Sequence, residues 1–409
     1  MSGPLEGLLV VDLTRALAGP HAAMMLGDLG ARVIKVERPG GDDSRGWGPP
    51  FLHPEGKDRE SAYFLSANRG KESIVLDLAS PAGNALLEQL IVRADALIEN
   101  FRPGVLDRLG FGHARLAGLN PRLVVLSITA FGHDGPEGTR PGYDQIAQGE
   151  SGLMSLTGSG PDDPQRSGVP ITDLLAGMYG AYGLLAALRE RDRTGRGQVV
   201  RTSLLAAGVG VHAYHGTAWT VGGTVGRAQG NHHPSIAPYG LFRCADGSVQ
   251  LACGSEGLWK RLCAEFGLDA DRPGRATNAE RVAHRAEVVA ELESVFAASA
   301  AEEILSRLDA AGVPAGRVRT LDQVYEWEQT DAQGLKITVD HETLGPITLP
   351  GPPLRFFDMA TGTETTRASH TAPPVLDAHA EPIRRWLTAP HGQIDRATPD
   401  RPEPVSPAS

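Results

Sequence analysis

The first part of the chain alternates short apolar runs with helical stretches. One apolar run, LLVVDL, covers Leu8–Leu13, and a second covers Ala31–Val36. The intervening residues 21–30, HAAMMLGDLG, form a helical stretch. A strand, a helix and a second strand in this order predict a βαβ unit with parallel strands.

The same alternation continues towards the middle of the chain. Ser73–Leu78 is strand-like, and Ser80 and Pro81 supply an N-cap and a first-turn proline for the next helix. The apolar residues of that helix share one face: Ala82, Leu86, Leu87, Leu90, Ile91 and Ala94. Ala96–Ile98 and Leu123–Ile128 are near-continuous apolar runs, which parallel strands covered on both faces require. The sequence predicts an α/β fold with a doubly wound, mostly parallel, Rossmann-like sheet.

A long apolar helix follows, and after it the amino-acid composition changes. Residues 173–189, DLLAGMYGAYGLLAALR, predict a core helix that packs closely against another element. Beyond residue 222 come turn formers, a hairpin signal around Ala245-Asp246-Gly247, and a helical stripe of Val282, Val288, Val289, Leu292, Val295 and Phe296. We therefore expect a large domain over residues 1–222, a small α+β domain over 223–325, a return to the large domain over 326–388, and a disordered tail over 389–409.

Composition and charge exclude several classes of protein. The 409 residues are 41% hydrophobic and 22% charged, which is ordinary for a globular chain. A net charge of −10 gives no overall positive field to hold a nucleic acid. The N-terminus lacks a signal-peptide pattern, and no uncharged apolar run reaches the length of a membrane span. Cys244, Cys253 and Cys263 fit neither a zinc site nor a disulfide framework, so we expect no metal and a cytoplasmic location.

The first strand-to-helix turn and the basic residues suggest an anionic ligand. The turn, Thr14–Pro20, lacks the GxGxxG pattern, although Glu37 stands where a dinucleotide fold often keeps its ribose acid. A nicotinamide cofactor is therefore disfavoured. Basic residues flank the early strands, namely Arg38, Lys71, Arg102 and Arg108. In a doubly wound sheet they either converge on a phosphorylated ligand or are scattered surface charges, and the pattern alone favours scattered charges.

Asp173 immediately precedes the apolar helix. The pattern alone favours an N-cap, the commonest use of an aspartate at this position. A helix N-terminus also favours the ionised carboxylate and lowers its pKa, which suits a carboxylate nucleophile. On periodicity alone, the N-cap is the clearly favoured interpretation.

Six ordered blocks of residues resemble the class III CoA-transferase family (CaiB/BaiF type). The blocks are LEGLLVVDLTRALAGPHAAMMLGDLGARVIKVERPGGDDSRGWGPPF, SANRGKESIVLDL, ALIENFRPGVLDRLG, SITAFGHDGP, RPGYDQIAQGESGLMSLTG and PITDLLAGMYGAYGLLAAL. The resemblance runs from about residue 4 to about residue 355. It is strongest to the branch of succinyl-CoA:glutarate and related dicarboxylate CoA-transferases.

The resemblance implies residue roles and an assembly. Asp173 matches the family's nucleophilic aspartate, and CoA contacts are implied for Ala16, Leu17, Ala18, Arg38, Lys71, Asn100, Phe101 and Arg108. Leu17 replaces a glutamine of the formyl-CoA-transferase pattern. Acyl-CoA and a small carboxylic acid are then substrates, no prosthetic group is needed, and two chains are expected to form an interlocked homodimer. The implied reaction moves CoA from an acyl-CoA donor to a carboxylic acid through a mixed anhydride and an aspartyl-CoA thioester, and we expect succinyl-CoA as the donor and a dicarboxylate as the acceptor.

Two alternatives and an acceptor site complete the expectations. The family includes α-methylacyl-CoA racemases, but their histidine base falls at Tyr143, a poor base at neutral pH, so a racemase or epimerase ranks second. Asp144 is expected to hold local structure. A non-catalytic CoA-binding protein is the third hypothesis. Residues 230–234, GNHHP, replace a glycine run of the formyl-transferring branch, and the candidate acceptor contacts are Arg140, Tyr143, Arg166, His232 and His233.

Overall fold

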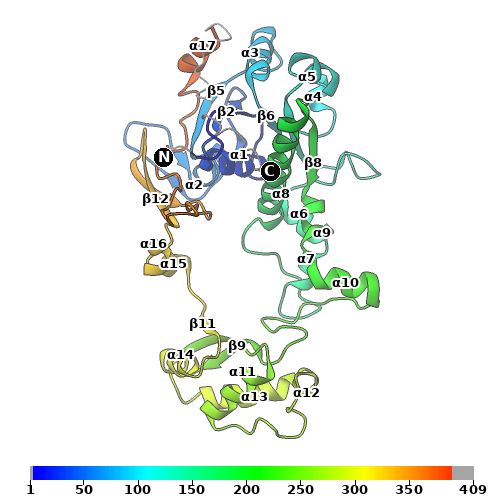
Figure 1. Cartoon of the computed structure of the whole chain (residues 1–409), viewed down its shortest axis with the longest axis vertical. Coiled ribbons are helices and arrows are strands. Elements are labelled where there is room, and N and C mark those ends of the chain that lie inside the picture. The colour runs from blue at the N-terminus through cyan, green and yellow to red at the C-terminus, as the bar shows by residue number, and fades with distance from the viewer. Residues whose placement is uncertain (1–2, 389–409) are drawn as a thin grey trace, which may run out of the picture. The chain divides into compact units, whose positions relative to one another are not determined.

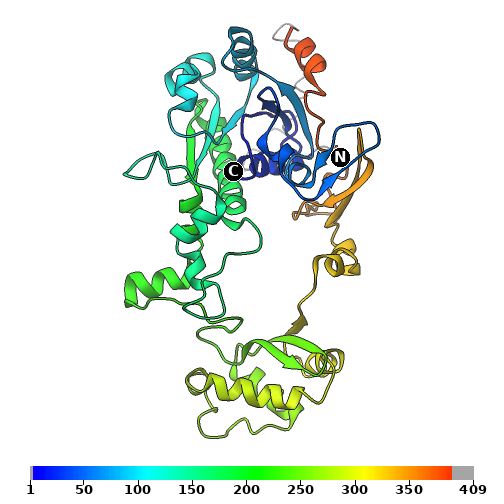
Figure 2. The same ribbon diagram turned by 180° about the vertical axis from the view of Figure 1, so that it is seen from behind.

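The computed structural model describes residues 3–388, which form two compact units (Figures 1 and 2). Unit 1 contains residues 3–151, 168–212 and 331–388. Unit 2 contains Gly152–Ser167 and Ala213–Thr330. The smaller unit thus begins at Ala213 instead of 223, and it includes a stretch that precedes Asp173. The predicted disordered tail, 389–409, lies outside the described residues.

Unit 1 is built on a six-stranded parallel sheet with the order β5-β2-β1-β6-β7-β8. The strands are β1 (Leu9–Asp12), β2 (Arg32–Glu37), β5 (Lys71–Val75), β6 (Ala96–Glu99), β7 (Val124–Thr129) and β8 (Val199–Ser203). The chain winds outwards from β1 through β2 to β5, and then from β6 through β7 to β8, so the direction of winding reverses between β1 and β6. The predicted α/β class with a parallel sheet is confirmed. Ligands of such sheets bind at this reversal, beyond the carboxyl ends of the strands.

The helices of unit 1 are α1 (Ala18–Asp28), α2 (Ala62–Ser66), α3 (Pro81–Arg93), α4 (Val105–Arg108), α5 (His113–Leu119), α6 (Asp144–Glu150), α8 (Ile171–Thr194), α9 (Leu204–Gly210) and α17 (Ala380–Thr388), with a 3₁₀ turn η1 at Asp43–Gly46. One core cluster packs α1 and α8 onto one face of the sheet, around Val10, Leu126 and Leu184. A second cluster packs α3, α5 and α17 onto the other face, around Val11 and Leu90. Adjacent strand residues alternate between the two clusters because successive side chains of a strand point to opposite faces.

Two glycines let α8 approach its neighbours closely, as its small residues predicted. A Cβ atom added at Gly177 would lie 2.6 Å from the carbonyl oxygen of Ala18 on α1. One added at Gly180 would lie 2.9 Å from the side chain of Leu126 on β7. By length and composition alone α8 could cross a membrane, but core helices pass the same test, and buried residues of α8 pack against α1 and the sheet.

The remaining strands are antiparallel. In unit 2, β9 (Tyr239–Cys244) and β10 (Gly247–Ala252) form the predicted hairpin, and β11 (Ala315–Arg317) pairs with β10. In unit 1, β3 (Phe51–Leu52) pairs with β4 (Glu60–Ser61), and β12 (Lys336–His341) pairs with β13 (Gly345–Pro350). The helices of unit 2 are α7 (Leu153–Leu156), α10 (Ala213–Gly222), α11 (Glu256–Phe266), α12 (Asn278–Ala283), α13 (Arg285–Phe296), α14 (Ala301–Ala310), α15 (Leu321–Tyr325) and α16 (Glu328–Ala332).

Replacing Gly177 by alanine should destabilise the protein, because its new methyl group meets backbone that cannot rotate away. We expect a loss of about 1–3 kcal/mol in the free energy of unfolding. The control is Gly118→Ala on α5, where an added Cβ meets no atom within 4 Å. Denaturant unfolding of both variants checks this; equal stabilities would show that α1 and α8 are not in tight contact.

Candidate functional site

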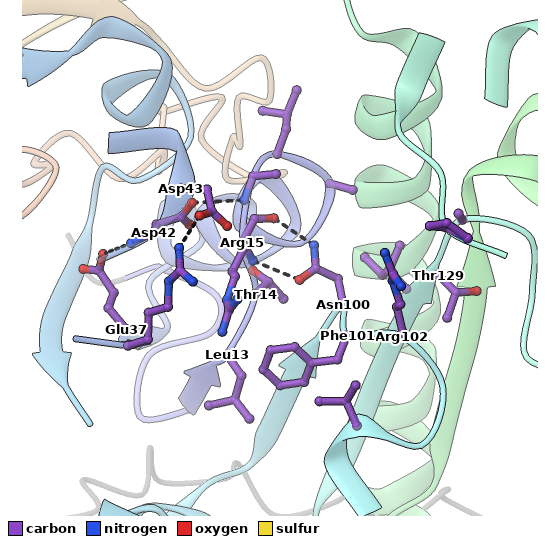
Figure 3. A pocket seen from close by; sticks show the side chains of 18 of the residues that line it. Leu13, Thr14, Arg15, Glu37, Asp42, Asp43, Asn100, Phe101, Arg102 and Thr129 are labelled. Atoms are coloured by element: carbon purple, nitrogen blue, oxygen red, sulfur yellow. Dashed lines mark hydrogen bonds and ion pairs between the residues drawn. The ribbon is translucent and has the colours of Figure 1, made fainter. Parts of the chain in front are cut away.

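A pocket of about 590 Å³ lies at the carboxyl edge of the sheet, where the winding reverses (Figure 3). Segments that follow β1, β2, β5, β6 and β7 line it, and Asp173 of α8 contributes to its wall. All of these segments belong to unit 1. The pocket therefore stands where the doubly wound fold places its ligands.

The turn after β1 is fixed by side chains from two other loops. Asn100, directly after β6, accepts a hydrogen bond from the Arg15 amide at 2.9 Å and donates one to the Arg15 carbonyl at 2.8 Å, as Figure 3 shows. Asp42 accepts from the Ala16 amide at 3.2 Å. Ala16 has a φ of +65°, a left-handed conformation that alanine rarely adopts. The hydrogen bonds from Asn100 and Asp42 to the backbone of Arg15 and Ala16 stabilise this otherwise unfavourable conformation.

Two buried lysines support the turn from beneath. Lys35 donates to the Thr14 carbonyl at 2.9 Å and to Asp42 at 2.8 Å. Lys71 donates to Asp12 at 2.9 Å, and also to the Pro20 carbonyl and the Asn68 side chain, both at 2.8 Å. Burial opposes ionisation of Asp12, but the charges of Lys71 and Lys35 outweigh it, so the pKa of Asp12 lies below its usual value.

Lys71 therefore has no place in the pocket, contrary to the role implied by the resemblance. Its three ammonium donors already have three acceptors inside the protein, and its side chain is fully buried. The chain reaches the pocket a little later, through Leu76–Ala79 beyond the end of β5. Arg108, exposed on α4, is also absent from the pocket wall.

The other implied CoA contacts meet in the pocket. Its lining includes Ala16, Leu17, Ala18, Arg38, Asn100 and Phe101. Arg38 forms an ion pair with Asp43 and donates to the Gly41 carbonyl at 3.2 Å. The Glu37 carboxylate, considered above as a ribose acid, is engaged instead by Arg45, at 2.7 and 2.8 Å, and by Ser73.

Two arginines of the pocket were not among the CoA contacts implied by the resemblance, although Arg102 was one of the basic residues considered for a phosphorylated ligand. Arg15 lies in the first turn, with its guanidinium carbon 5.5 Å from the centre of the Phe101 ring. Arg102 follows Phe101 and is exposed. Their positions beyond β1 and β6 were the available signal, because these two strands flank the reversal of winding. With Arg38 they place three guanidinium groups in the pocket lining, which also contains the carboxyl groups of Glu37, Asp42, Asp43, Asp77 and Asp173.

Asp173 lies in the first turn of α8, and Pro170 is the N-cap residue. The interpretation of Asp173 as the N-cap is therefore wrong. The cap comes from α6: Asp144 accepts from the Thr172 amide at 2.8 Å, the Thr172 hydroxyl at 2.7 Å and the Asp173 amide at 3.4 Å. Gln148 donates to the second oxygen of Asp144 at 2.7 Å. Asp144 thus holds local structure, as expected, and leaves the Asp173 carboxyl to face the pocket.

The pKa of Asp173 is raised to about 7, the opposite of the predicted direction. Burial of the carboxyl is the larger cause, and the negative charge of Asp144 is the second. The helix N-terminus, from which we expected a lowered pKa, is already occupied by Asp144. A carboxylate of this basicity is a stronger nucleophile than an ordinary aspartate, and part of it is ionised at neutral pH.

Tyr63 of α2 also belongs to this electrostatic environment. Burial raises the pKa of its phenol to about 12, and the charges of Asp173, Asp144 and Asp42 add to the increase. Its ring packs edge-on against Trp47 of the pocket lining, with ring centres 4.9 Å apart. The neutral phenol is a hydrogen-bond donor that the sequence pattern did not reveal.

The predicted acceptor residues divide between the two units. Arg140 and Tyr143 line the pocket of unit 1. The Arg140 guanidinium pairs with Glu137 and Glu150 and lies 4.7 Å from the centre of the Phe131 ring. Arg166, His232 and His233 belong to unit 2.

The two histidines are held within unit 2. The His233 ring lies between Tyr214 and Tyr239, with ring centres 5.9 and 5.1 Å away, and the His232 ring meets Phe242 edge-on. Burial and the nearby Arg285 charge lower the pKa of both histidines. A neutral imidazole can donate one hydrogen bond to a carboxylate but supplies no counter-charge.

Comparison with known proteins identifies the class. A profile described as CoA-transferase family III matches residues 5–380. The chain is 37% identical over 399 residues to succinyl-CoA:glutarate CoA-transferase from Mus musculus, covering 96% of this chain and 88% of the mouse protein. It is 39% identical over 364 residues to succinate–glutarate CoA-transferase from Agrobacterium fabrum, covering 86% of this chain and 91% of that protein.

A solved structure agrees. The crystal structure of a CaiB/BaiF family protein from Brucella suis matches with a TM-score of 0.83 at 39% identity, and the match covers 95% of this chain and all of that one. The chain belongs to CoA-transferase family III and is an enzyme of the transferase type. The family expected from the sequence blocks is confirmed.

Replacing Asp173 by asparagine should stabilise the protein above about pH 7. The folded state holds the Asp173 proton up to about pH 7, whereas the unfolded chain releases it near 3.8, so this carboxyl costs stability progressively across that window. The gain in unfolding free energy should reach at most about 4 kcal/mol and vanish below about pH 4. Thermal unfolding across pH checks this.

Asp163 is the matched control for this comparison. Ser159 and Gln165 lower the pKa of its exposed carboxyl, so Asp163→Asn should cause a small change of opposite sign. If Asp173→Asn destabilises the protein near pH 8, the carboxyl does not carry a raised pKa in the folded state.

Proposed function

We propose that the enzyme transfers CoA from succinyl-CoA to a free dicarboxylate, with Asp173 as the nucleophile. The observation that carries the proposal is the partly buried Asp173 carboxyl, with its raised pKa, on the wall of the pocket at the sheet edge, which Arg15, Arg38 and Arg102 also line. The names of the mouse and Agrobacterium relatives, which specify succinate and glutarate, support the choice of donor and acceptor class.

The reaction proceeds by four acyl exchanges that balance without a redox step. An Asp173 oxygen attacks the thioester carbonyl, the C–S bond breaks, and a mixed anhydride and the CoA thiolate result. The thiolate attacks the Asp173 acyl carbon and expels succinate, which leaves an aspartyl-CoA thioester. The acceptor carboxylate attacks that thioester to form a new anhydride and the thiolate. The thiolate then takes the acceptor acyl group, and Asp173 returns as a carboxylate.

Charge that develops on each carbonyl oxygen needs hydrogen-bond donors. The N-cap residue of α1 is Leu17, whose side chain makes no capping hydrogen bond to the first amides of the helix. Leu17 and Ala18 both line the pocket. Backbone amides at a helix N-terminus combine free donors with a positive dipole end. We assign them the oxyanion role, where one donor typically contributes about 3–4 kcal/mol to the transition state.

The distal carboxylate of the acceptor needs a partner, and of the predicted acceptor residues in this pocket Arg140 is the cationic one. Its pairs with Glu137 and Glu150 are exposed and therefore weak, so a bidentate carboxylate can displace one of them. The interlocked homodimer, the cytoplasmic location, and contacts from Arg166, His232 and His233 stay predictions.

Replacing Asp173 by alanine or asparagine should lower transfer by at least about a thousandfold, because the covalent route is lost. Binding of CoA should survive, since the turn after β1 is unaltered. Mass spectrometry of acyl-CoA products measures transfer, and hydroxylamine trapping should label Asp173 only in the wild type. Deuterium exchange at the α-carbon of a 2-methylacyl-CoA without an acceptor would instead support a racemase.

Replacing Arg140 by glutamine should raise KM for glutarate by about tenfold while leaving a monocarboxylate such as butyrate nearly unaffected. The control is Arg193→Gln, an exposed arginine paired with Glu190 at the far end of α8. An acceptor screen with succinyl-CoA measures both variants. Equal losses for the two acceptors would place the distal carboxylate elsewhere.

A further inference from the structure

Three polar side chains form a chain behind the pocket, across the ends of β6 and β7. Glu99 closes β6 and is 7% exposed, and Ser127 on β7 is 5% exposed. The Ser127 hydroxyl contacts one oxygen of Glu99 and lies 2.7 Å from Nε2 of His133 in the loop beyond β7. The transfer mechanism uses none of these groups.

The other oxygen of Glu99 binds the backbone of a residue that lines the pocket. It accepts a hydrogen bond from the Phe101 amide at 2.8 Å. Phe101 and Asn100 line the pocket, and Asn100 fixes both polar groups of the Arg15 backbone. One buried carboxyl thus ties the Asn100–Phe101 segment, and through it the first turn, to a histidine outside the pocket lining.

The single hydroxyl proton of Ser127 gives this chain two arrangements. When Glu99 is ionised, Ser127 donates to Glu99 and His133 donates its Nε2 proton to Ser127. When Glu99 carries a proton, it donates to Ser127, and Ser127 donates to an unprotonated Nε2. The Phe101 amide is held more strongly in the first arrangement, because a hydrogen bond to an ionised acceptor is roughly twice as strong.

The surrounding charges leave both arrangements accessible. Burial raises the pKa of Glu99, with a contribution from Asp107 on α4, while Ser127, the Phe101 amide and Arg201 on β8 oppose the increase. Burial lowers the pKa of His133, and Arg201 and His113 act in the same direction against Asp134. Arg201 also lies 3.6 Å from Asp134, so it influences both ends of the chain.

We propose that Glu99 is a positioning residue of the CoA pocket: its bond to the Phe101 amide sets the place of the Asn100–Phe101 segment, and Ser127 couples that bond to the protonation state of His133. The inference rests on the proposed CoA site and deepens it. Affinity for CoA then depends on a proton held outside the pocket lining.

Four variants test the proposal in the full-length enzyme. Glu99→Ala removes both bonds. Glu99→Gln keeps an acceptor for the Phe101 amide but removes the charge. Ser127→Ala leaves the Phe101 bond and breaks the link to His133. Glu88→Gln is the control, a partly exposed glutamate of α3 paired with Arg115. The measurements are the Kd of CoA by calorimetry and the KM and kcat for succinyl-CoA, each from about pH 6 to about pH 9.

Glu99→Ala should raise the Kd and KM by about tenfold and change kcat by less than about threefold. Glu99→Gln should restore most of the affinity. We expect the wild type and the Glu88→Gln control to show the same pH dependence of the Kd of CoA. Glu99→Gln should lose the component of that dependence that comes from Glu99, and Ser127→Ala should change the same component. A wild-type pH profile in both Glu99→Gln and Ser127→Ala overturns the coupling, whichever way Glu99→Ala folds.

An unchanged Kd in a folded Glu99→Ala variant overturns the positioning role. The proposed function fails in a different way. If the wild type binds no CoA, or if Asp173→Ala retains full transfer, the CoA site or the nucleophile is wrong, independently of Glu99.

Discussion

The pocket depends on two lysine ammonium groups that are buried beneath the first turn. Lys35 with Asp42 and Lys71 with Asp12 are all almost fully inaccessible. Burying an unpaired charge costs several kcal/mol of folding free energy. Each lysine therefore needs its aspartate partner and the backbone carbonyls that accept its remaining hydrogen bonds. Those carbonyls include Thr14 and Pro20, on either side of Ala16. The hydrogen bonds of the two lysines therefore fix the backbone of the first turn on both sides of Ala16. They stabilise the left-handed conformation of Ala16 at its centre.

Interior strands were the predictable part of the fold. β1, β2, β6 and β7 are buried on both faces, and burial on both faces produces the continuous apolar runs that the pattern detected. The sixth strand, β8, escaped prediction because Val200 and Thr202 alternate with the exposed Arg201, so the strand contains no continuous apolar run. The limits of the two units differ from the expected domain limits because the short segment Gly152–Ser167 belongs to unit 2. This segment is far in sequence from the rest of unit 2, and local sequence patterns do not record such long-range contacts.

At the site, the sequence predicts a residue's location where the order of strands and loops sets it. It does not predict the location of a functional group that depends on the partners of its side chain. Residues after β1 and β6 fall at the reversal of winding by topology alone, which brought Ala16, Asn100 and Phe101 together. The direction of the Lys71 side chain depends on Asp12 and Asn68, and neither is identifiable as its partner from spacing. The pKa of Asp173 was misjudged in the same way: the helix terminus is visible in the sequence, whereas the distant Asp144 that occupies it is not.

The contact of Gly177 with the Ala18 carbonyl joins the helix that carries Asp173 to the helix that opens beside the first turn. Because this contact is backbone against backbone, the separation between the carboxylate and the α1 amides is set by main-chain geometry and tolerates no intervening side chain. The part of the pocket wall formed by the long, exposed side chains of Arg140 and Tyr143 has no such restriction. Under the proposed mechanism, substitutions at Arg140 or Tyr143 can therefore change the choice of acid without altering the backbone contact that places Asp173 relative to α1.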